Sequence, residues 1–400
     1  MLNNKSFGIG FILFLVLSST VAQVATQITT PLLPLIAKDF LVSAGLVQRS
    51  ISAYLLGMAL SGIFLGYLSD YFGRRRIMLI ALIFGCLGTG CCIFAKDVTF
   101  LIIGRFIQGI GLSGVWIISR AITRDISVGS ELAKIFSLLT MLDVVIICLS
   151  PLLGGVIESH FGWRAVFIVF LVYNLLVILA TFCVKSKLKQ ADIPFPGLSN
   201  LFRPIVQLLK NKTFLFFNGI VSAVYAIQVT YSAIGTFIFQ NDLGLSATQF
   251  GLVALLISVA YIFGAFINSR IVAYLSIKKI FIIAIAMMWG GLAILLSVCL
   301  FIKLSLSIML VFVVLGSVAG SIIMINGLTM ALSSVDTDIG SSSAVMSTSQ
   351  FIAGFVFTAA ISFFDAKSII PFTFILAFLA VIITILSLTA SFPEKAAYHK

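Results

Sequence analysis

The chain has 400 residues, of which 61% are hydrophobic and only 10% are charged, and its mean hydropathy is +1.21. About half of a soluble globular domain is apolar, so this composition excludes an ordinary soluble protein and indicates membrane-spanning helices. The formal net charge of +12 does not indicate nucleic-acid binding, because the basic residues occur in short clusters between apolar runs.

Apolar runs recur along the whole chain, and each is long enough to cross a hydrocarbon core of about 30 Å as a helix. The alternation over about ten residues that is typical of membrane β-barrels is not found. The expected fold is therefore all-α and integral to the membrane, with twelve transmembrane helices. In chain order we predict spans over residues 7–35, 46–69, 77–95, 98–120, 134–157, 163–184, 213–240, 246–271, 279–302, 304–333, 340–364 and 369–391.

One polar stretch interrupts this pattern. Residues 185–212 carry six Lys and Arg together with three Pro, and we read them as a linker. The linker separates an N-terminal half, residues 1–184, from a C-terminal half, residues 213–400. The halves repeat each other, because 52–82 aligns with 255–285 and places a basic turn after the second span of each half. Two such halves in parallel repeat are a transporter architecture, with the substrate site between them.

The Lys and Arg residues also predict the orientation in the membrane. With both termini in the cytoplasm, 18 of the 25 lie on that side, 6 lie outside, and Arg105 lies within a span. Cytoplasmic loops are enriched in positive residues. We therefore expect a multi-pass membrane protein with cytoplasmic termini and a cytoplasmic linker.

Three stretches resemble signatures of the major facilitator superfamily. One is a loop that contains Gly66, Asp70, Gly73, Arg74 and Arg75; the others are "LIIGRFIQGIGLSG" (101–114) and "SPLLGG" (150–155). More narrowly, "SRAITRD" (119–125), "FGWRAVF" (161–167), "SAIGTFIFQNDLGLSATQFG" (232–251) and "FINSR" (266–270) are similar to the bicyclomycin- and chloramphenicol-resistance group of twelve-span drug:proton antiporters. The resemblance covers nearly the whole chain and implies a transporter of the bacterial inner membrane.

The loop raises the question of why an acid stands among three Arg. A carboxylate at the end of the second span can accept hydrogen bonds from the N-terminus of a neighbouring helix. The resemblance implies that Asp70 latches onto the start of the eleventh span, near Gly340 to Ser343, and closes the cytoplasmic side, while Gly66 and Gly73 allow close approach of backbone. The alternative is that Asp70 only pairs with Arg74.

Arg105 and Asp143 are the charges that we predict for proton coupling. A charge inside the membrane costs at least about 2.5–3.5 kcal/mol and is usually functional, although a structural role for each residue stays open. The related group carries an acid in the first span, at the position of Gln27 in this chain, so Asp143 is the best remaining carboxylate. The expected partners of Arg105 are Gln23, Gln27, a backbone carbonyl or Asp143.

Pro151, Gly154 and Gly155 form the stretch that resembles the antiporter motif. Proline bends a helix and small residues let helices pack closely, so this stretch either seals the two halves against ion leak or is an ordinary packing kink. The substrate cavity is predicted by analogy to be apolar and aromatic, with few hydrogen-bonding groups. Its expected lining is Gln23, Gln27, Thr30, Trp116, Tyr225, Gln228, Tyr231, Asn326 and Gln350.

Enzyme activity is not expected, because the only His residues are His160 and His399 and no catalytic motif is found. We expect no cofactor and no metal, and we expect a monomer that binds a small molecule, protons and the lipid bilayer but no nucleic acid. The predicted function is proton-coupled efflux of small amphipathic drugs by alternating access. The alternative is export or import of an endogenous metabolite or siderophore, with or without proton coupling.

Overall fold

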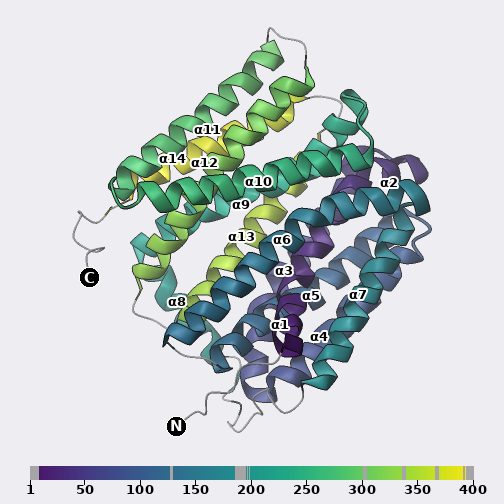
Figure 1. The fold of residues 1–400 in the computed structure, drawn as a ribbon, viewed down its shortest axis with the longest axis vertical. Helices are drawn as coiled ribbons and strands as arrows, with labels where there is room; N and C mark the ends of the chain where they lie inside the picture. The colour runs from purple at the N-terminus through teal and green to yellow at the C-terminus, as the bar shows by residue number, and fades with distance from the viewer. Residues whose placement is uncertain are drawn as a thin grey trace.

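A computed structural model describes residues 9–126, 129–184, 195, 197, 199–300, 304–335, 339–364, 369–390 and 392. Within these ranges the secondary structure is helical, and twelve helices are long and apolar enough to cross a membrane. The helices gather into two bundles that lie side by side (Figure 1). The expectation of twelve transmembrane helices in two six-helix halves is confirmed.

The first bundle is built from α1 to α7. Its first span is broken into three pieces, because Pro31 and Pro34 each lack the N–H that a continuous helix needs. The bounds are α1 (Ile9–Gln27), the 3-10 turn η1 (Thr30–Leu32), α2 (Leu33–Asp39), α3 (Ala44–Phe72), α4 (Arg74–Ile93), α5 (Val98–Ile126), α6 (Gly129–Phe161) and α7 (Trp163–Cys183).

The second bundle is built from α9 to α14. Side chains of Asn211, Ser246 and Ser305 accept hydrogen bonds from the first turns of α9, α10 and α12, and so fix where these helices begin. The bounds are α9 (Lys212–Phe237), the π-helical turn η3 (Ile238–Asp242), α10 (Ala247–Ile271), α11 (Ile277–Leu300), α12 (Leu306–Ser333), α13 (Ile339–Ile361) and α14 (Ile369–Thr389).

The linker contains a helix that the sequence reading missed, α8 (Ser199–Lys210). Leu201 and Leu208 are buried, and Ile205 packs on the core of the second bundle. These three residues follow the helical spacing of an amphipathic face. Burial of that face outweighs the one helical hydrogen bond lost at Pro204.

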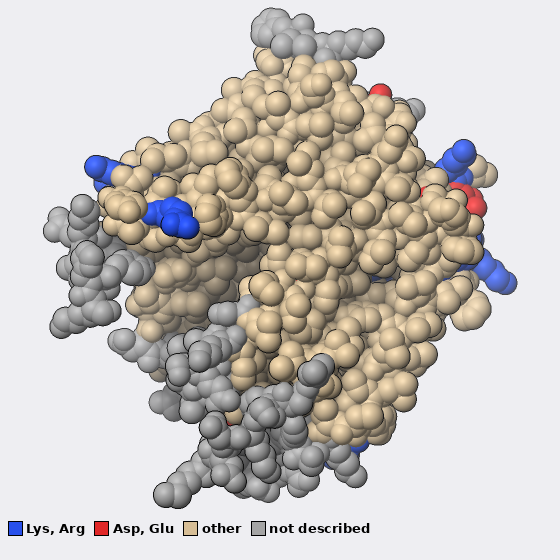
Figure 2. All heavy atoms as spheres, viewed as in Figure 1, with Lys and Arg blue, Asp and Glu red and all other residues tan. Residues whose placement is uncertain are grey.

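The two ends of the bundles are distinct. We call the end that holds α8 the linker end and the opposite end, which holds α2, the far end (Figure 1). Phe392, which follows α14, packs on Phe217 and Phe281 near the starts of α9 and α11. Figure 2 shows that Lys, Arg, Asp and Glu lie near the edges of the visible face, with a broad uncharged surface between them. An uncharged belt of this kind suits the hydrocarbon layer of a bilayer.

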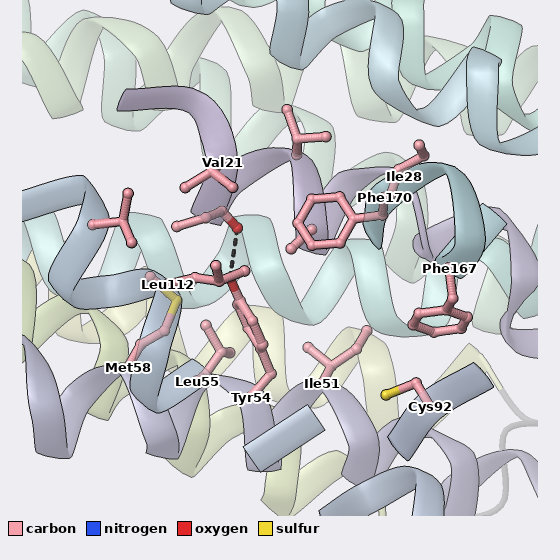
Figure 3. Close-up of a cluster of buried hydrophobic side chains, with 14 of the residues drawn as sticks. Val21, Ile28, Ile51, Tyr54, Leu55, Met58, Cys92, Leu112, Phe167 and Phe170 are labelled. Atoms are coloured by element: carbon pink, nitrogen blue, oxygen red, sulfur yellow. Dashed lines mark hydrogen bonds between the residues drawn. The ribbon is translucent and has the colours of Figure 1, made fainter. Parts of the chain in front are cut away.

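The core of the first bundle is a continuous set of apolar side chains around α1, α3, α5 and α7. Figure 3 shows part of it, with Tyr54 of α3 reaching toward α1. The Tyr54 hydroxyl donates a 2.7 Å hydrogen bond to the carbonyl of Ala22, marked by the dashed line. A buried tyrosine needs such a partner, and the bond fixes α1 against α3.

The two bundles touch each other at the far end. Gln240 donates to the carbonyl of Pro31 at 2.8 Å and Thr248 donates to the carbonyl of Gly155 at 3.1 Å. The guanidinium of Arg49 lies 5.1 Å from the ring centre of Phe363. Backbones also meet directly, since a Cβ added at Gly45 would lie 2.3 Å from the carbonyl oxygen of Ser362. These contacts hold the far end closed in this conformation.

Candidate functional site

A cavity of about 380 Å³ lies between the bundles, on the inner side of the far-end contacts. Helices from both halves contribute to its wall, including α1, α5 and α6 from the first and α9, α10 and α13 from the second. Most of the lining is apolar or aromatic. The polar side chains that line it are Ser19, Gln23, Thr26, Gln27, Thr30, Arg120, Thr140, Asp143, Gln228, Ser232, Ser258 and Gln350. These twelve polar side chains are more hydrogen-bonding groups than the sequence predicted. Apolar and aromatic walls with polar groups that orient a ligand are the usual form of a small-molecule site.

Asp143 is the carboxylate of this cavity. It projects from the middle of α6, and the hydroxyl of Ser19 on α1 donates a 2.6 Å hydrogen bond to its Oδ1. Its side chain is only partly buried, because it faces the cavity. A carboxylate that is held by one neutral donor and reaches a cavity can exchange a proton with water or with a ligand.

The cation near this carboxylate is Arg120, which is not among the site residues predicted from the sequence. Arg120 lines the same cavity, interacts electrostatically with Asp143, and holds its guanidinium 4.2 Å from the ring centre of Trp116. The predicted fourth span ends at this residue, whereas α5 continues to Ile126. Arg120 therefore lies within the helix, and its side chain is exposed to the central cavity.

Arg105 lies elsewhere, in the interior of the first bundle. Only 2% of its surface is exposed, and it does not line the central cavity. Its guanidinium donates to the carbonyl of Ala25 at 3.1 Å and to the side chain of Gln108, and it lies 4.3 Å from the ring centre of Tyr54. Of the partners expected for Arg105, the structure shows a backbone carbonyl, and it places Arg120 where we expected Arg105.

Most of the expected lining residues do face the cavity. Gln23, Gln27 and Thr30 come from the first span, and Trp116, Tyr225, Gln228, Tyr231 and Gln350 come from three further helices, α5, α9 and α13. Asn326 does not belong to this lining. It is buried on α12, where its amide donates to Asn268 Oδ1 at 2.6 Å and so ties α12 to α10.

An aromatic cluster forms part of the wall between the halves. The ring of Phe351 on α13 lies 5.9 Å from the ring of Trp116 and 5.9 Å from the ring of Tyr225, both in edge-on geometry. Such pairs hold their partners by more than burial alone. Sequence reasoning missed Phe351, because an apolar residue in an apolar helix carries no signal of its position.

The basic loop at the linker end is an ion-pair cluster. Gly73 has a φ of 91°, which favours glycine and ends α3 just before α4 begins. Arg74 is buried and pairs with Asp70 on one side and with Asp125 of α5, at 2.9 Å, on the other. Arg75 donates to the carbonyl of Thr181 on α7 at 3.3 Å. In this conformation the Asp70 side chain is 49% exposed. It pairs with Arg74, which is the predicted alternative to a latch on the eleventh span.

Two glycines of α6 lie against the backbone of other helices. A Cβ added at Gly154 would lie 2.1 Å from the carbonyl oxygen of Ile28, and one added at Gly155 would lie 2.5 Å from that of Ala247. Gly251 of α10 meets Leu152 of α6 in the same way, at 2.6 Å from its Cα. Pro151 lies within α6, next to these contacts on the side of the central cavity, and it lines that cavity. At Gly155 and Gly251 the backbones of α6 and α10 leave no room for a Cβ on either glycine.

A substrate-sized cavity between two six-helix membrane bundles defines the class as a membrane transporter. The family model of the Major Facilitator Superfamily matches residues 15–358, and the chain belongs to that family. It is therefore a multi-pass membrane transporter and not an enzyme, and the resemblance read from its motifs is confirmed.

Relatives and solved structures agree with this assignment. The chain is 29% identical over 328 residues to the uncharacterized MFS-type transporter YdgK of Bacillus subtilis, covering 81% of each chain. It is 28% identical over 278 residues to the bicyclomycin resistance protein homolog of Haemophilus influenzae, covering 69% of this chain and 70% of the relative. The crystal structure of a D-xylose-proton symporter shares the fold, with a TM-score of 0.73 at 17% identity, and the match covers 97% of this chain and 99% of that one.

Proposed function

We propose that this transporter exports small amphipathic compounds in exchange for protons, by alternating access of the cavity between the two halves. The proposed cargo is similar to bicyclomycin or chloramphenicol. The similarity to a bicyclomycin resistance protein homolog supports the class of cargo. The cavity wall, which combines apolar and aromatic side chains with polar ones, supports an amphipathic cargo.

The observation that carries the proposal is the place of Asp143 in the cavity. Its carboxylate lies on the wall that a substrate would touch, bound by Ser19 and facing the charge of Arg120. Protonation of Asp143 would leave the charge of Arg120 without its counter-charge. Substrate and proton would then compete for the same small region, which is what an exchange mechanism requires.

Arg120 also bears on the chemistry of the cargo. It is the cation of the cavity wall, and its electrostatic partner there is Asp143. A neutral or anionic group of a substrate can accept hydrogen bonds from a guanidinium, whereas a dication would be repelled by it. The proposal therefore favours neutral and anionic compounds over dications.

The proposal includes an orientation and an assembly. The linker end faces the cytoplasm of a bacterium, in its inner membrane, because most Lys and Arg outside the spans fall at that end. The chain acts as a monomer in which residues 1–184 and 213–400 rock against each other about the cavity. The linker over 185–212, with α8, follows their movement.

A second candidate function is export or import of an endogenous metabolite or siderophore. Arg120 favours it, since a guanidinium in the wall also suits a carboxylate of a metabolite. Proton coupling is not required in this case.

One transport assay separates the candidates. The purified protein would be placed in vesicles with chloramphenicol, a lipophilic cation or an iron chelate, each with and without a pH gradient. Accumulation of chloramphenicol that depends on the gradient is the expected result. Transport of the chelate alone, or transport of chloramphenicol at the same rate without a gradient, would contradict the first proposal.

A further inference from the structure

A second, smaller cavity lies inside the C-terminal half, enclosed by α9, α10, α11, α12 and α14. We call it the side pocket; its wall includes Ile227, Tyr231, Ile257, Met288, Phe312 and Leu376. Its volume is about 90 Å³, room for about three water molecules at about 30 Å³ each. Protein interiors are close-packed, so a void of this size within one bundle calls for an occupant.

The side pocket adjoins the central cavity. Gln228 and Tyr231 of α9 and Ile257 and Tyr261 of α10 line both of them. These four side chains therefore form a shared wall between the two spaces.

The side pocket is mainly apolar, and its polar lining residues are Gln228, Tyr231, Tyr261 and Ser317. The hydroxyl of Tyr231 is shielded from solvent and has no hydrogen-bond partner among the described residues. The Tyr231 ring packs on Phe372, with ring centres 6.4 Å apart, and Phe372 packs on Phe312 of the pocket wall at the same distance. A buried hydroxyl without a partner is destabilising, and a ligand atom that pairs with it would supply the missing hydrogen bond.

Two glycines of α12, Gly316 and Gly320, contribute no side chain to the wall of the side pocket. A Cβ added at Gly316 would meet nothing within 4 Å, and one added at Gly320 would meet only a methyl group of Val224 at 3.7 Å. Both residues line the side pocket, one helical turn apart. The space is thus accessible to a small group without displacement of the backbone.

We propose that the side pocket is a binding subsite that takes a small apolar substituent of the transported compound, with Tyr231 pairing to a hydrogen-bonding atom at its edge. The substituent is a branched alkyl group or the edge of an aromatic ring. The inference rests on the proposed function for the identity of the cargo. The binding itself can be tested without transport.

The probe pair is 4-(trifluoromethyl)phenol and (trifluoromethyl)benzene, which differ by one hydroxyl. Fluorine NMR of the full-length protein in lipid nanodiscs distinguishes protein-bound probe from probe in lipid. The parent protein should bind both. Gly316→Leu fills the pocket and should weaken binding of both about tenfold or more, because the buried apolar contact is lost.

The matched control is Gly290→Leu. Gly290 lies on the exposed face of α11 with nothing within 4 Å of an added Cβ, so this variant gains the same side chain outside the pocket and should bind both probes as the parent does. Tyr231→Phe should weaken the phenol about fivefold, the effect of one hydrogen bond, and leave (trifluoromethyl)benzene unchanged.

Failure of this proposal and failure of the proposed function are distinguishable. If the parent shows no protein-bound probe, or if Gly316→Leu and Gly290→Leu bind equally, the side pocket is not a binding subsite. Equal loss of both probes in Tyr231→Phe would overturn the role of its hydroxyl. Chloramphenicol transport is measured on the same preparations, and its absence together with specific probe binding would reject the cargo and keep the subsite.

Discussion

Ser19 of α1 donates a 2.6 Å hydrogen bond to the carboxylate of Asp143 on α6, across the wall of the central cavity. The bond joins two helices of the same half, so it survives a rocking movement of that half as a unit. Asp143 therefore keeps its position relative to Ser19 while the opposite wall of the cavity, which comes from the second half, changes.

The first prediction concerns this carboxylate. Asp143→Asn keeps the shape and removes the ability to bind and release a proton, so transport driven by a pH gradient should be lost while substrate binding changes less than about threefold, the effect of one altered polar contact. Glu158→Gln, on the same helix but near its far end and outside the central cavity, is the control. Gradient-driven transport by Asp143→Asn at the parental rate would place the coupling group elsewhere.

A related variant tests the position where the related antiporters carry an acid. Gln27 lines the same cavity as Asp143. Gln27→Asp alone should be tolerated, and in the Asp143→Asn background it should restore part of the gradient-driven transport. The measurement is drug accumulation in vesicles as a function of the imposed pH gradient.

The second prediction separates the two arginines. Arg105→Gln removes two hydrogen bonds and the contact with Tyr54 from a buried site, and should destabilise the protein by about 2–4 kcal/mol. Arg120→Gln should alter substrate affinity and the dependence of transport on pH with little loss of stability. Thermal unfolding of the purified variants measures the first effect and vesicle transport the second. Equal destabilisation by both changes would contradict the structural role of Arg105.

The third prediction concerns the proposed latch. If Asp70 holds the linker end closed when the far end opens, Asp70→Asn should favour the conformation in which the far end is closed. The variant should lower transport without loss of membrane insertion. Ser362→Cys reports closure of the far end, because Ser362 is only 6% exposed in this conformation and its backbone carbonyl lies against Gly45 of the other half. Labelling of Ser362→Cys from outside the cell should fall in the Asp70→Asn background.

Asp125→Asn is the control for the latch. It also removes a carboxylate from Arg74, but it does not remove the group proposed to reach the start of α13. Labelling close to the parental level is expected. If Asp125→Asn and Asp70→Asn lower labelling equally, the role of Asp70 is confined to its pair with Arg74.

The fourth prediction tests the glycine contact at the far end. Gly155→Val places atoms where the carbonyl oxygen of Ala247 already lies 2.5 Å from an added Cβ. Since backbone cannot give way cheaply, α6 and α10 must separate. The variant should raise passive proton leak across vesicles, and Gly290→Val should not. A variant as tight as the parent would show that these glycines only assist packing.

The fifth prediction is the topology. In a cysteine-free background, a cysteine placed at Gly197 should react with a membrane-impermeant maleimide only from the cytoplasmic side. A cysteine placed at Ser159, near the far end of α6, should react only from outside. Reversed labelling would overturn the proposed orientation.

Sequence predicted the helices of this fold closely, because a bilayer admits few other solutions for an apolar chain. The predicted span edges differ from the observed ones mainly where helices continue beyond the apolar region. Because of that difference, Arg120 was not predicted as a residue of the cavity. The apolar pattern ends at Arg120, whereas α5 runs on to Ile126 and places this side chain on the wall of the central cavity.

The cavity lining was predictable in part. Polar residues such as Gln23, Gln27 and Gln350 stand out in apolar helices, and they face the cavity. Asn326 stands out equally but bonds to Asn268, and sequence cannot tell a polar contact between two helices from a polar contact with a cavity. The side pocket could not be predicted from the sequence, because part of its space results from the absence of side chains at Gly316 and Gly320.

The contacts that hold the far end closed have a consequence for how the protein responds to ionic strength. Among the described residues, no ion pair crosses between the halves there; hydrogen bonds between neutral groups, touching backbones and the Arg49–Phe363 contact do. The charged cluster of Asp70, Arg74 and Asp125 at the linker end lies within the first half and does not cross to the second. Salt screens exposed charges and leaves neutral contacts nearly unaffected. Concentrated electrolyte should therefore change the closure of the far end little, and the carrier should rest in the same conformation in saline and in dilute medium.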